Sequence, residues 1–488
     1  MQNLSRRRFL KTSLIAAGAG LASTRWTSAW AQPVGANDAV RIAIIGLSTK
    51  GTAHIKQLLE TPGVRIAAVC DLDSQMIARA TELLAARQVT AFTTTDARAV
   101  LDRADIDVVV IATSNHWHAL LTVWACQAGK DVYVEKPMSR TVWEGRQMIE
   151  AAARHRRIVQ VGMQYHSETG LAAAQRYLAT GKLGRIRHVR AVVYAKRDSI
   201  GRRAPWYPEN LDYDRFCGPT PVVPLERTNL HYDWHWMWAT GNGDLGNNGV
   251  HVLGAALRFA GHTTLAPRIV SLGGRYAIDD VAETPNTMLT LYDYPEIPVL
   301  YEQRGLTAKP GVTYMDQCQG QRLGIIVTCE GGSVAGLTGA VAFDNDGKVL
   351  EKFPGDGGAT HMRNFLDAVR SRRDADLAAP ATLGHLAAAT CHYGNISYRV
   401  GVPASGAAAE SALGSFAVAR GVLQELNQHV GLHGVDLART PFTVGTSIHP
   451  DETGDGIARV GATGDLTTAR YLLRETQRPP YGFGDTPA

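Results

Sequence analysis

The chain has 488 residues, of which 45% are hydrophobic and 19% charged, and its formal net charge is +5. This is the balance of a globular protein with sizeable buried cores, and the length allows two domains or one large domain with additions. The small net charge, without a Lys/Arg run interleaved with aromatic residues, argues against nucleic-acid binding.

Residues 1–31 have the pattern of a twin-arginine export signal. Arg6, Arg7 and Arg8 precede a weakly hydrophobic stretch rich in alanine and glycine, and Ala29 and Ala31 are small residues where a signal peptidase reads the chain. The apolar stretch is too short and too interrupted by glycine to be a stable membrane anchor. We therefore expect the twin-arginine machinery to export the folded protein to the periplasm. A basic amphipathic helix is the alternative.

From residue 38 to residue 163, short apolar runs alternate with helical stretches. Strands are predicted at 40–46, 64–71, 107–113, 131–137 and 158–162, with helices at 54–62, 118–129 and 143–155. Near-continuous Val/Ile runs are typical of strands buried on both faces, and their alternation with helices predicts a parallel, doubly wound sheet.

The turn after the first strand is an incomplete dinucleotide-binding fingerprint. Gly46 and Gly51 occupy the first and third glycine positions of G-x-G-x-x-G, but Ser48 takes the place of the second. Serine adds only a small side chain, and its hydroxyl can donate to a phosphate. Asp71 closes the next strand, where a carboxylate would bind the adenosine ribose and repel a 2′-phosphate. The pattern therefore predicts NAD rather than NADP. A flavodoxin-like sheet whose glycines merely close turns is the alternative.

Six cysteines are scattered along the chain without a C-x-x-C pair or a His/Cys cluster of metal-ligand spacing. We predict no structural metal, and the sequence indicates no particular disulfide.

The segment Val108 to Gly145 resembles the central signature of the glucose–fructose oxidoreductase/inositol dehydrogenase/MocA (Gfo/Idh/MocA) family. It carries a strand, an N-x-x-H segment at Asn115 and His118, and the tripeptide Glu135-Lys136-Pro137. The segments 181–189, 241–251 and 383–401 continue the likeness. The stretch from Trp236 to His251 is similar to exported members of the family.

The resemblance implies an α/β fold with an N-terminal Rossmann domain and a C-terminal α/β domain built on a large, open, mixed or antiparallel sheet. Apolar runs at 186–195, 268–277, 286–294, 297–305 and 323–337 fit strands of that sheet, and 361–371 and 384–399 fit helices that return to the first domain. We assign 38–163 to the Rossmann domain, 164–403 to the substrate and oligomerisation domain, and 404–488 to an extension. In this family the open sheet face commonly serves for assembly, so a homo-dimer or homo-tetramer is expected.

The resemblance also implies catalytic residues. Lys136, at the carboxyl edge of the sheet, would stabilise an alkoxide, with a cis bond at Pro137 and Glu135 bracing the turn. His251 would accept the hydroxyl proton. Many relatives have an aspartate four residues before that histidine, but here the position holds Asn247, which cannot stabilise an imidazolium by charge. Asp244 could replace that charge or could cap a helix.

Further candidates complete the predicted cleft. We assign cofactor contacts also to Thr49, Thr113, Asn115, His118, Glu135, Lys136 and Gln164, and substrate contacts to Tyr165, His235, Trp236 and Asp244. The aromatic stretch 229–238 suits stacking on sugar rings, although it could equally be core. A zinc site at His231, His235 and His251 is disfavoured, because the three show no recognised ligand spacing.

These features predict an exported NAD-dependent oxidoreductase acting on a sugar, polyol or glycoside. A periplasm lacks a free nicotinamide pool, so the cofactor is expected to be tightly held and regenerated in place. The alternative is an NAD-dependent glycosidase that oxidises C3 transiently, eliminates, hydrates and re-reduces. A third possibility is a non-catalytic sugar-binding protein with the same fold.

Overall fold

The computed structural model describes residues 39–462 and 464–484. The predicted signal segment, residues 1–31, lies outside the described residues. Within the described part of the chain, no helix combines the length and the apolar character needed to cross a bilayer.

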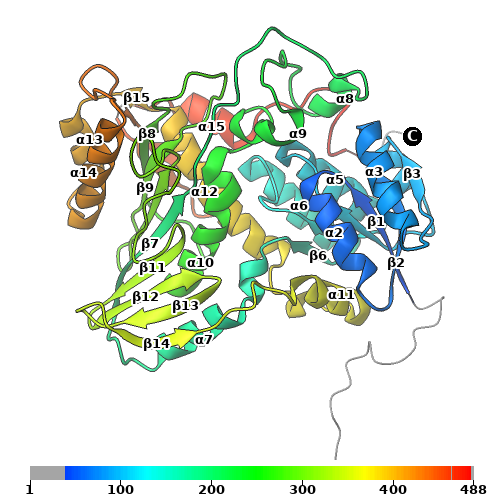
Figure 1. Cartoon of the computed structure of the whole chain (residues 1–488), viewed down its shortest axis with the longest axis horizontal. Helices are drawn as coiled ribbons and strands as arrows, with labels where there is room; N and C mark the ends of the chain where they lie inside the picture. Colours follow the sequence, from blue (N-terminus) through cyan, green and yellow to red (C-terminus); the bar gives the residue numbers. More distant parts are fainter. Residues whose placement is uncertain (1–38, 463, 485–488) are drawn as a thin grey trace, which may run out of the picture.

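The first domain is a six-stranded parallel sheet in the order β3-β2-β1-β4-β5-β6 (Figure 1). Its strands are β1 (Val40–Ile45), β2 (Val64–Cys70), β3 (Phe92–Thr94), β4 (Val108–Ile111), β5 (Asp131–Val134) and β6 (Val159–Val161). Its helices are α2 (Thr49–Leu59), α3 (Ser74–Ala85), α4 (Ala97–Leu101), α5 (Asn115–Gln127) and α6 (Val142–His155). The strand order reverses direction between β1 and β4, and ligands of such sheets bind at the carboxyl ends of the strands beside that switch point.

Both faces of this sheet are covered, as its continuous apolar runs require. On one face, α11 (His361–Ser371) inserts Phe365 and Leu366 into a core that includes Ile42, Ile44 and Tyr133. A helix more than 300 positions away from β1 thus completes the core of the first domain.

The second sheet has twelve strands, with the main order β14-β13-β12-β11-β7-β10-β9-β8-β16-β15, and β17 and β18 joined at β8. The strands are β7 (Ile186–Tyr194), β8 (Ile269–Gly274), β9 (Thr287–Tyr292), β10 (Val299–Arg304), β11 (Leu323–Cys329), β12 (Gly332–Leu337), β13 (Gly339–Phe343), β14 (Val349–Phe353), β15 (Val402–Pro403), β16 (Thr443–Val444), β17 (Ile448–Pro450) and β18 (Ile457–Val460). Strands β7 and β10 pair in parallel and the other strand pairs described for this sheet are antiparallel, so the sheet is mixed. The α/β fold class is confirmed.

Two helices fill the space between the sheets. Figure 1 shows α10 (Val250–Ala260) and α12 (Ala381–Arg399) running between the second sheet and the first domain. Their buried residues share one apolar core with β6 and β8, through side chains such as Val161 and Ile269. The remaining helical segments are η2 (Gln164–Ser167), α7 (Thr169–Ala179), α8 (Tyr213–Cys217), α9 (Leu230–Asp233), η3 (Trp234–Trp236), η4 (Leu245–Gly249), η5 (Asp374–Asp376), α13 (Gly406–Ala412), α14 (Ala417–Leu432) and α15 (Leu466–Arg474).

The part of the chain after residue 403 is built into the second sheet. Strand β16 pairs with β8, and α13 and α14 pack their apolar sides on β8, β9 and β10. In Figure 1 these two helices lie at the outer edge of the sheet. They cover part of the sheet face to which the family resemblance assigns assembly, and the homo-dimer or homo-tetramer remains a prediction.

Two leucines of α14 test this packing. Leu423 is 1% exposed within the core beneath α14, whereas Leu432 is 61% exposed at the end of the same helix. Because truncating a buried leucine leaves a cavity, Leu423→Ala is expected to lower the free energy of unfolding by about 2–5 kcal/mol. Leu432→Ala, the matched control, is expected to change it by less than about 0.5 kcal/mol. Equal effects of the two substitutions in denaturant melts would show that α14 is not packed as described.

Candidate cofactor and active site

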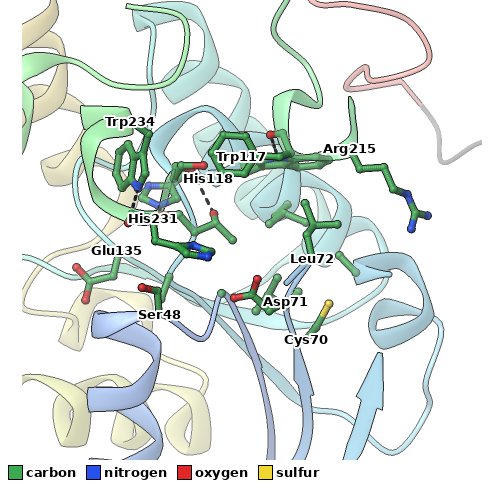
Figure 2. Close-up of a pocket in the computed structure, with 18 of the residues that line it drawn as sticks. Ser48, Cys70, Asp71, Leu72, Trp117, His118, Glu135, Arg215, His231 and Trp234 are labelled. Carbon is green, nitrogen blue, oxygen red and sulfur yellow. Dashed lines mark hydrogen bonds between the residues drawn. The ribbon is translucent and has the colours of Figure 1, made fainter. Parts of the chain in front are cut away.

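A cavity of about 490 Å³ lies at the carboxyl ends of β1, β2, β4 and β5. Its other wall is a segment of the second domain, residues 211–236, which we call the cover. Figure 2 shows Asp71 and Glu135 on opposite sides of this cavity, with His231 between them and Trp117 on the Asp71 side. Ten residues predicted for the site line it: Gly46, Ser48, Thr49, Asp71, Thr113, His118, Glu135, Lys136, His235 and Asn247.

The turn from β1 to α2 requires glycine at both predicted positions. Gly46 has φ +89°, and a Cβ on it would lie 2.5 Å from the carbonyl oxygen of Ala112. A Cβ on Gly51 would lie 1.8 Å from the carbonyl oxygen of Gly46. The absent side chains therefore let helix and strand approach as closely as they do in dinucleotide-binding turns.

The first turn of α2 is open for an anion. Ser48 is the N-cap residue but its hydroxyl makes no capping bond, and no acidic side chain stands in the first turn. Backbone N–H groups and the positive end of the helix dipole therefore face the cavity, as a pyrophosphate requires. The residues present fit a dinucleotide, and Ser48 in place of glycine leaves this cradle intact.

Asp71 is held in place by the backbone. One carboxylate oxygen accepts a hydrogen bond from the N–H of Leu47 at 2.7 Å, and the other accepts one from the N–H of Asp73 at 2.9 Å. Each carboxylate oxygen has a second lone pair, which suits the two hydroxyl groups of a ribose. Burial raises the pKa of this carboxyl, against the effect of the two amides.

Glu135 is the centre of a buried charge cluster at the end of β5. His54 Nε2 lies 2.9 Å from its Oε1, and Lys50 Nζ lies 3.5 Å from the same oxygen. Burial alone would raise the pKa of Glu135, but the hydrogen bond with His54 and the charges of Lys50 and Lys136 hold it well below its usual value. Glu135 is therefore an anion that braces the turn before Lys136. The Lys136–Pro137 bond is cis, as the resemblance implied.

Lys136 joins the two domains. Its Nζ donates to both the backbone oxygen and the Oδ1 of Asn247 in η4, each at 2.7 Å. Burial lowers the pKa of Lys136 to about 8, against the raising effect of Glu135. An ammonium group has three N–H donors, so one remains for a substrate hydroxyl in the cavity.

Asp244 does not replace the charge missing at Asn247. Both of its carboxylate oxygens accept from the Arg197 guanidinium, at 2.6 Å and 2.5 Å, and its side chain makes no helix-capping bond. Arg197 in turn stacks over Trp236, 4.8 Å from its ring centroid. Neither Asp244 nor Trp236 lines the cavity, so the structure gives no support to their predicted substrate contacts.

His251 is sealed behind the cavity wall. It does not line the cavity, its ring lies edge-on to Tyr165 with the centroids 4.9 Å apart, and its Nδ1 is buried without a partner among the described residues. Burial and the charge of Lys136 hold its pKa well below the usual value. The imidazole is therefore neutral and lies outside the cavity lining.

Two other residues predicted to contact the cofactor, Asn115 and Gln164, do not line the cavity. Asn115 is buried and donates to Asn242 at 3.0 Å, and Gln164 begins η2 outside the cavity lining. His118 does line the cavity, but its ring nitrogens lie within hydrogen-bonding distance of the carbonyl oxygens of Pro137 and Thr113. His118 therefore fixes the backbone around the site rather than offering a free nitrogen.

His231, His235 and His251 do not form a metal-binding group. His231 Nε2 contacts Asp73, and His235 Nδ1 contacts the carbonyl oxygen of Tyr232 at 2.6 Å. No group of potential metal ligands occurs among residues 39–462 and 464–484. His235 stacks on Trp234 with centroids 3.6 Å apart, and its Nε2 has no partner among the described residues.

One end of the cavity is aromatic and basic, and its residues were not predicted from the sequence. Trp117, Leu121 and Trp124 line it from one face of α5, and Arg98, Arg215 and Tyr481 line it from other elements. The i, i+4, i+7 spacing of the three α5 residues was a visible signal of a shared helix face. No local sequence pattern predicts that Tyr481, which lies 364 positions after Trp117 in the chain, lines the cavity.

Residues 40–163 match the model of the Gfo/Idh/MocA family, described as "Oxidoreductase family, NAD-binding Rossmann fold". This confirms NAD as the predicted cofactor, and the likeness to the family is shown for this domain. A "Glycosyl hydrolase family 109 protein" of Shewanella sp. (strain W3-18-1) is 34% identical over 175 residues, and that of Shewanella putrefaciens (strain CN-32 / ATCC BAA-453) is equally similar. Each match covers 32% of this chain and 38% of the relative, so the chain matches little more than a third of these relatives' length.

Solved structures share the fold over most of the chain. The WlbA dehydrogenase of Bordetella pertussis, in complex with NADH and UDP-GlcNAcA, is 19% identical with a TM-score of 0.52, covering 72% of this chain and 94% of that one. A levoglucosan dehydrogenase in complex with NADH and levoglucosan is 17% identical with a TM-score of 0.53, covering 72% and 95%. At these identities the likeness is one of fold.

The glycine turn gives a direct test of the cofactor site. Gly51→Ala is expected to weaken NAD binding at least tenfold, because its Cβ overlaps the Gly46 carbonyl and must push helix and strand apart. The measurement is calorimetric titration of nucleotide-free protein with NAD. Gly421→Ala is the control, since a Cβ there meets nothing within 4 Å. Unchanged affinity in Gly51→Ala would place the dinucleotide elsewhere.

Proposed function

Because residues 40–163 form an NAD-binding domain of an oxidoreductase family, we propose that this protein transfers hydride between a ring carbon of a sugar, polyol or glycoside and a tightly held NAD. The observation that carries the proposal is the position of Lys136. Its ammonium group lines the same cavity as the open N-terminus of α2 and Asp71. The N-terminus of α2 for the phosphates, Asp71 for the ribose and Lys136 for the oxyanion therefore line one cavity.

The residues of the chain have separable roles in this proposal. NAD supplies the hydride acceptor when bound. Asn247 orients Lys136 through two hydrogen bonds, and the remaining N–H of Lys136 stabilises the negative charge that develops on the substrate oxygen. Glu135 braces the backbone before Lys136. Its negative charge raises the pKa of Lys136 and so favours the ammonium form.

The proton acceptor has two candidates. His251 is the one implied by the family pattern, but it is buried and does not line the cavity. His235 lines the cavity with its Nδ1 directed to the carbonyl of Tyr232. Burial lowers the pKa of His235 to about 3, so its ring is neutral at ordinary pH and a weak base in this state.

A glycosidase is the second candidate function. It is favoured by the relatives named glycosyl hydrolase family 109, whose matched region is about 34% identical to this chain. Oxidation at C3, elimination, hydration and re-reduction leave the cofactor unchanged over a cycle. The same cavity and the same Lys136 serve that chemistry, because it begins with the same hydride transfer.

We also propose export to the periplasm, with the cofactor acquired beforehand in the cytoplasm. Its support is the sequence around Arg6, Arg7 and Arg8 followed by the alanine-rich stretch. A carbohydrate substrate is supported by the two structural neighbours whose names include a nucleotide sugar and an anhydrosugar, and by the aromatic side chains of the cover.

One experiment separates these functions. The purified protein is denatured to release and identify its nucleotide, and intact protein is supplied with aryl glycosides and free sugars without added NAD. Aglycone release supports the glycosidase, and exchange of hydride between two sugars supports the oxidoreductase. Absence of bound nucleotide, together with failure to load any, would refute both.

Lys136 is expected to be essential in either case. Lys136→Met removes the cation at the reacting oxygen, and loss of such a donor typically costs about 10²–10³-fold in kcat. The measurement is turnover at saturating substrate, with bound nucleotide quantified in the same sample to show that the site is intact. Activity within threefold of the wild type would remove Lys136 from the mechanism.

The pH profile distinguishes the two protonation states of Lys136. If the ammonium form is active, hydride transfer falls as pH rises through about 8, where Lys136 loses its proton. Asn247→Asp places a carboxylate beside this ammonium and raises its pKa, so the alkaline limb moves to higher pH. Activity that instead rises through pH 8 would show that the neutral amine works, as a general base.

A further inference from the structure

The segment 475–484 crosses from the second domain to the cofactor cavity. In Figure 1 the chain leaves α15 and passes α8. Pro480 and Tyr481 of this segment line the cavity, and the ring of Tyr481 lies edge-on to Trp117 with centroids 5.4 Å apart. Figure 2 shows Trp117, Leu72 and Arg215 on the Asp71 side of the cavity, which is the adenosine end.

The segment is fixed to the first domain on both sides of Tyr481. Before it, the Glu475 carboxylate pairs with the buried guanidinium of Arg140 and with Arg399. After it, the Trp124 indole N–H donates to the carbonyl oxygen of Gly482 at 3.2 Å, and the Phe483 ring packs edge-on to Trp143 at 5.0 Å. Tyr481 is thus placed by contacts to α5 and α6 rather than left as a loose end.

The same segment holds the cover. Arg478 donates to the Asp214 carboxylate at 2.7 Å and to the Gly218 carbonyl oxygen at 3.1 Å, and its own N–H donates to the Pro219 carbonyl oxygen. These acceptors belong to α8 and the turn after it, inside the cover.

A second set of contacts joins this part of the second domain directly to the first domain. His231 Nε2 lies 2.7 Å from one oxygen of Asp73, and Asn210 donates to the other at 2.5 Å. Asp73 follows Asp71 by two positions, so these contacts lie beside the predicted position of the adenosine ribose. The cover is therefore held from two directions, by Asp73 and by the segment 475–484.

We propose that residues 475–484 are a latch that completes the adenosine end of the cofactor site and must release the cover before the dinucleotide can leave. Tyr481 supplies an aromatic wall beside Trp117 for the adenine, and Arg478 holds α8 over it. The inference rests on the cofactor part of the proposed function. It gives a physical basis for cofactor retention in a compartment without a nicotinamide pool.

The test measures dissociation of NAD rather than turnover. Protein loaded with radiolabelled NAD is mixed with excess unlabelled NAD, and the retained label is followed in time. A stop codon after Gln477 keeps Glu475 but removes the latch, and is expected to raise the dissociation rate at least tenfold. Tyr481→Ala, which removes only the aromatic wall, is expected to raise it less.

Point variants cover the case in which the truncated chain does not fold. Arg478→Ala and Asp214→Ala should each speed dissociation severalfold, and the double variant should be no faster than the faster single one, because both break one contact. Arg185→Ala is the matched control, since its guanidinium is 81% exposed and pairs with Glu330 on the second domain. It should leave the rate unchanged.

The outcomes separate the two proposals. Wild-type protein that cannot be loaded with NAD overturns the cofactor part of the proposed function and the latch with it. Wild-type protein that holds NAD, with truncated and Arg478→Ala forms releasing it within twofold of the wild-type rate, overturns the latch alone.

Discussion

The site depends on keeping one largely buried carboxylate charged. Glu135 is buried at the end of β5, and an ion in such a place is stable only if paired and hydrogen-bonded. His54, Lys50 and Lys136 supply those partners from two sides. Because His54 and Lys50 belong to α2, the same cluster that presents Lys136 to the cavity also fixes the helix whose N-terminus forms the phosphate cradle.

From this cluster, Lys136 reaches across the domain boundary to Asn247. The contact couples the carboxyl edge of the first sheet to η4, a π-helical turn directly before α10. π-Helical turns are frequent at functional sites. Asn247 occupies the position where an aspartate was expected. It therefore holds Lys136 by hydrogen bonds and does not stabilise a charged histidine. The neighbouring carboxylate, Asp244, is neutralised by Arg197 and acts in the packing behind the site.

Much of the fold was readable from the sequence because buried parallel strands are nearly pure Val/Ile runs. The strands that were not predicted from the sequence lack such runs. β3 has three residues, two of them exposed, and β14 is mostly exposed at a sheet edge. The run 323–337 looked like one strand, but the turn at Glu330 and Gly331 folds it into the hairpin of β11 and β12.

The site was readable where chemistry lies next to a strand end, as with Gly46, Asp71 and Lys136. It was not readable where partners are distant in sequence. The contact of Lys136 with Asn247 spans 111 positions, and that of Arg478 with Asp214 spans 264. The burial of His251 and its contact with Tyr165 join η2 to α10 across 86 positions of the chain, which no local pattern encodes.

The central claim is that chemistry occurs on a nicotinamide held in the cavity beside Lys136. The most direct test is rapid mixing of nucleotide-loaded protein with its sugar substrate while the absorbance of reduced nicotinamide is followed. The account predicts that the bound cofactor becomes reduced at least as fast as product forms, and that Lys136→Met prevents this reduction while retaining the nucleotide. Product formation with a cofactor that stays oxidised throughout would contradict it.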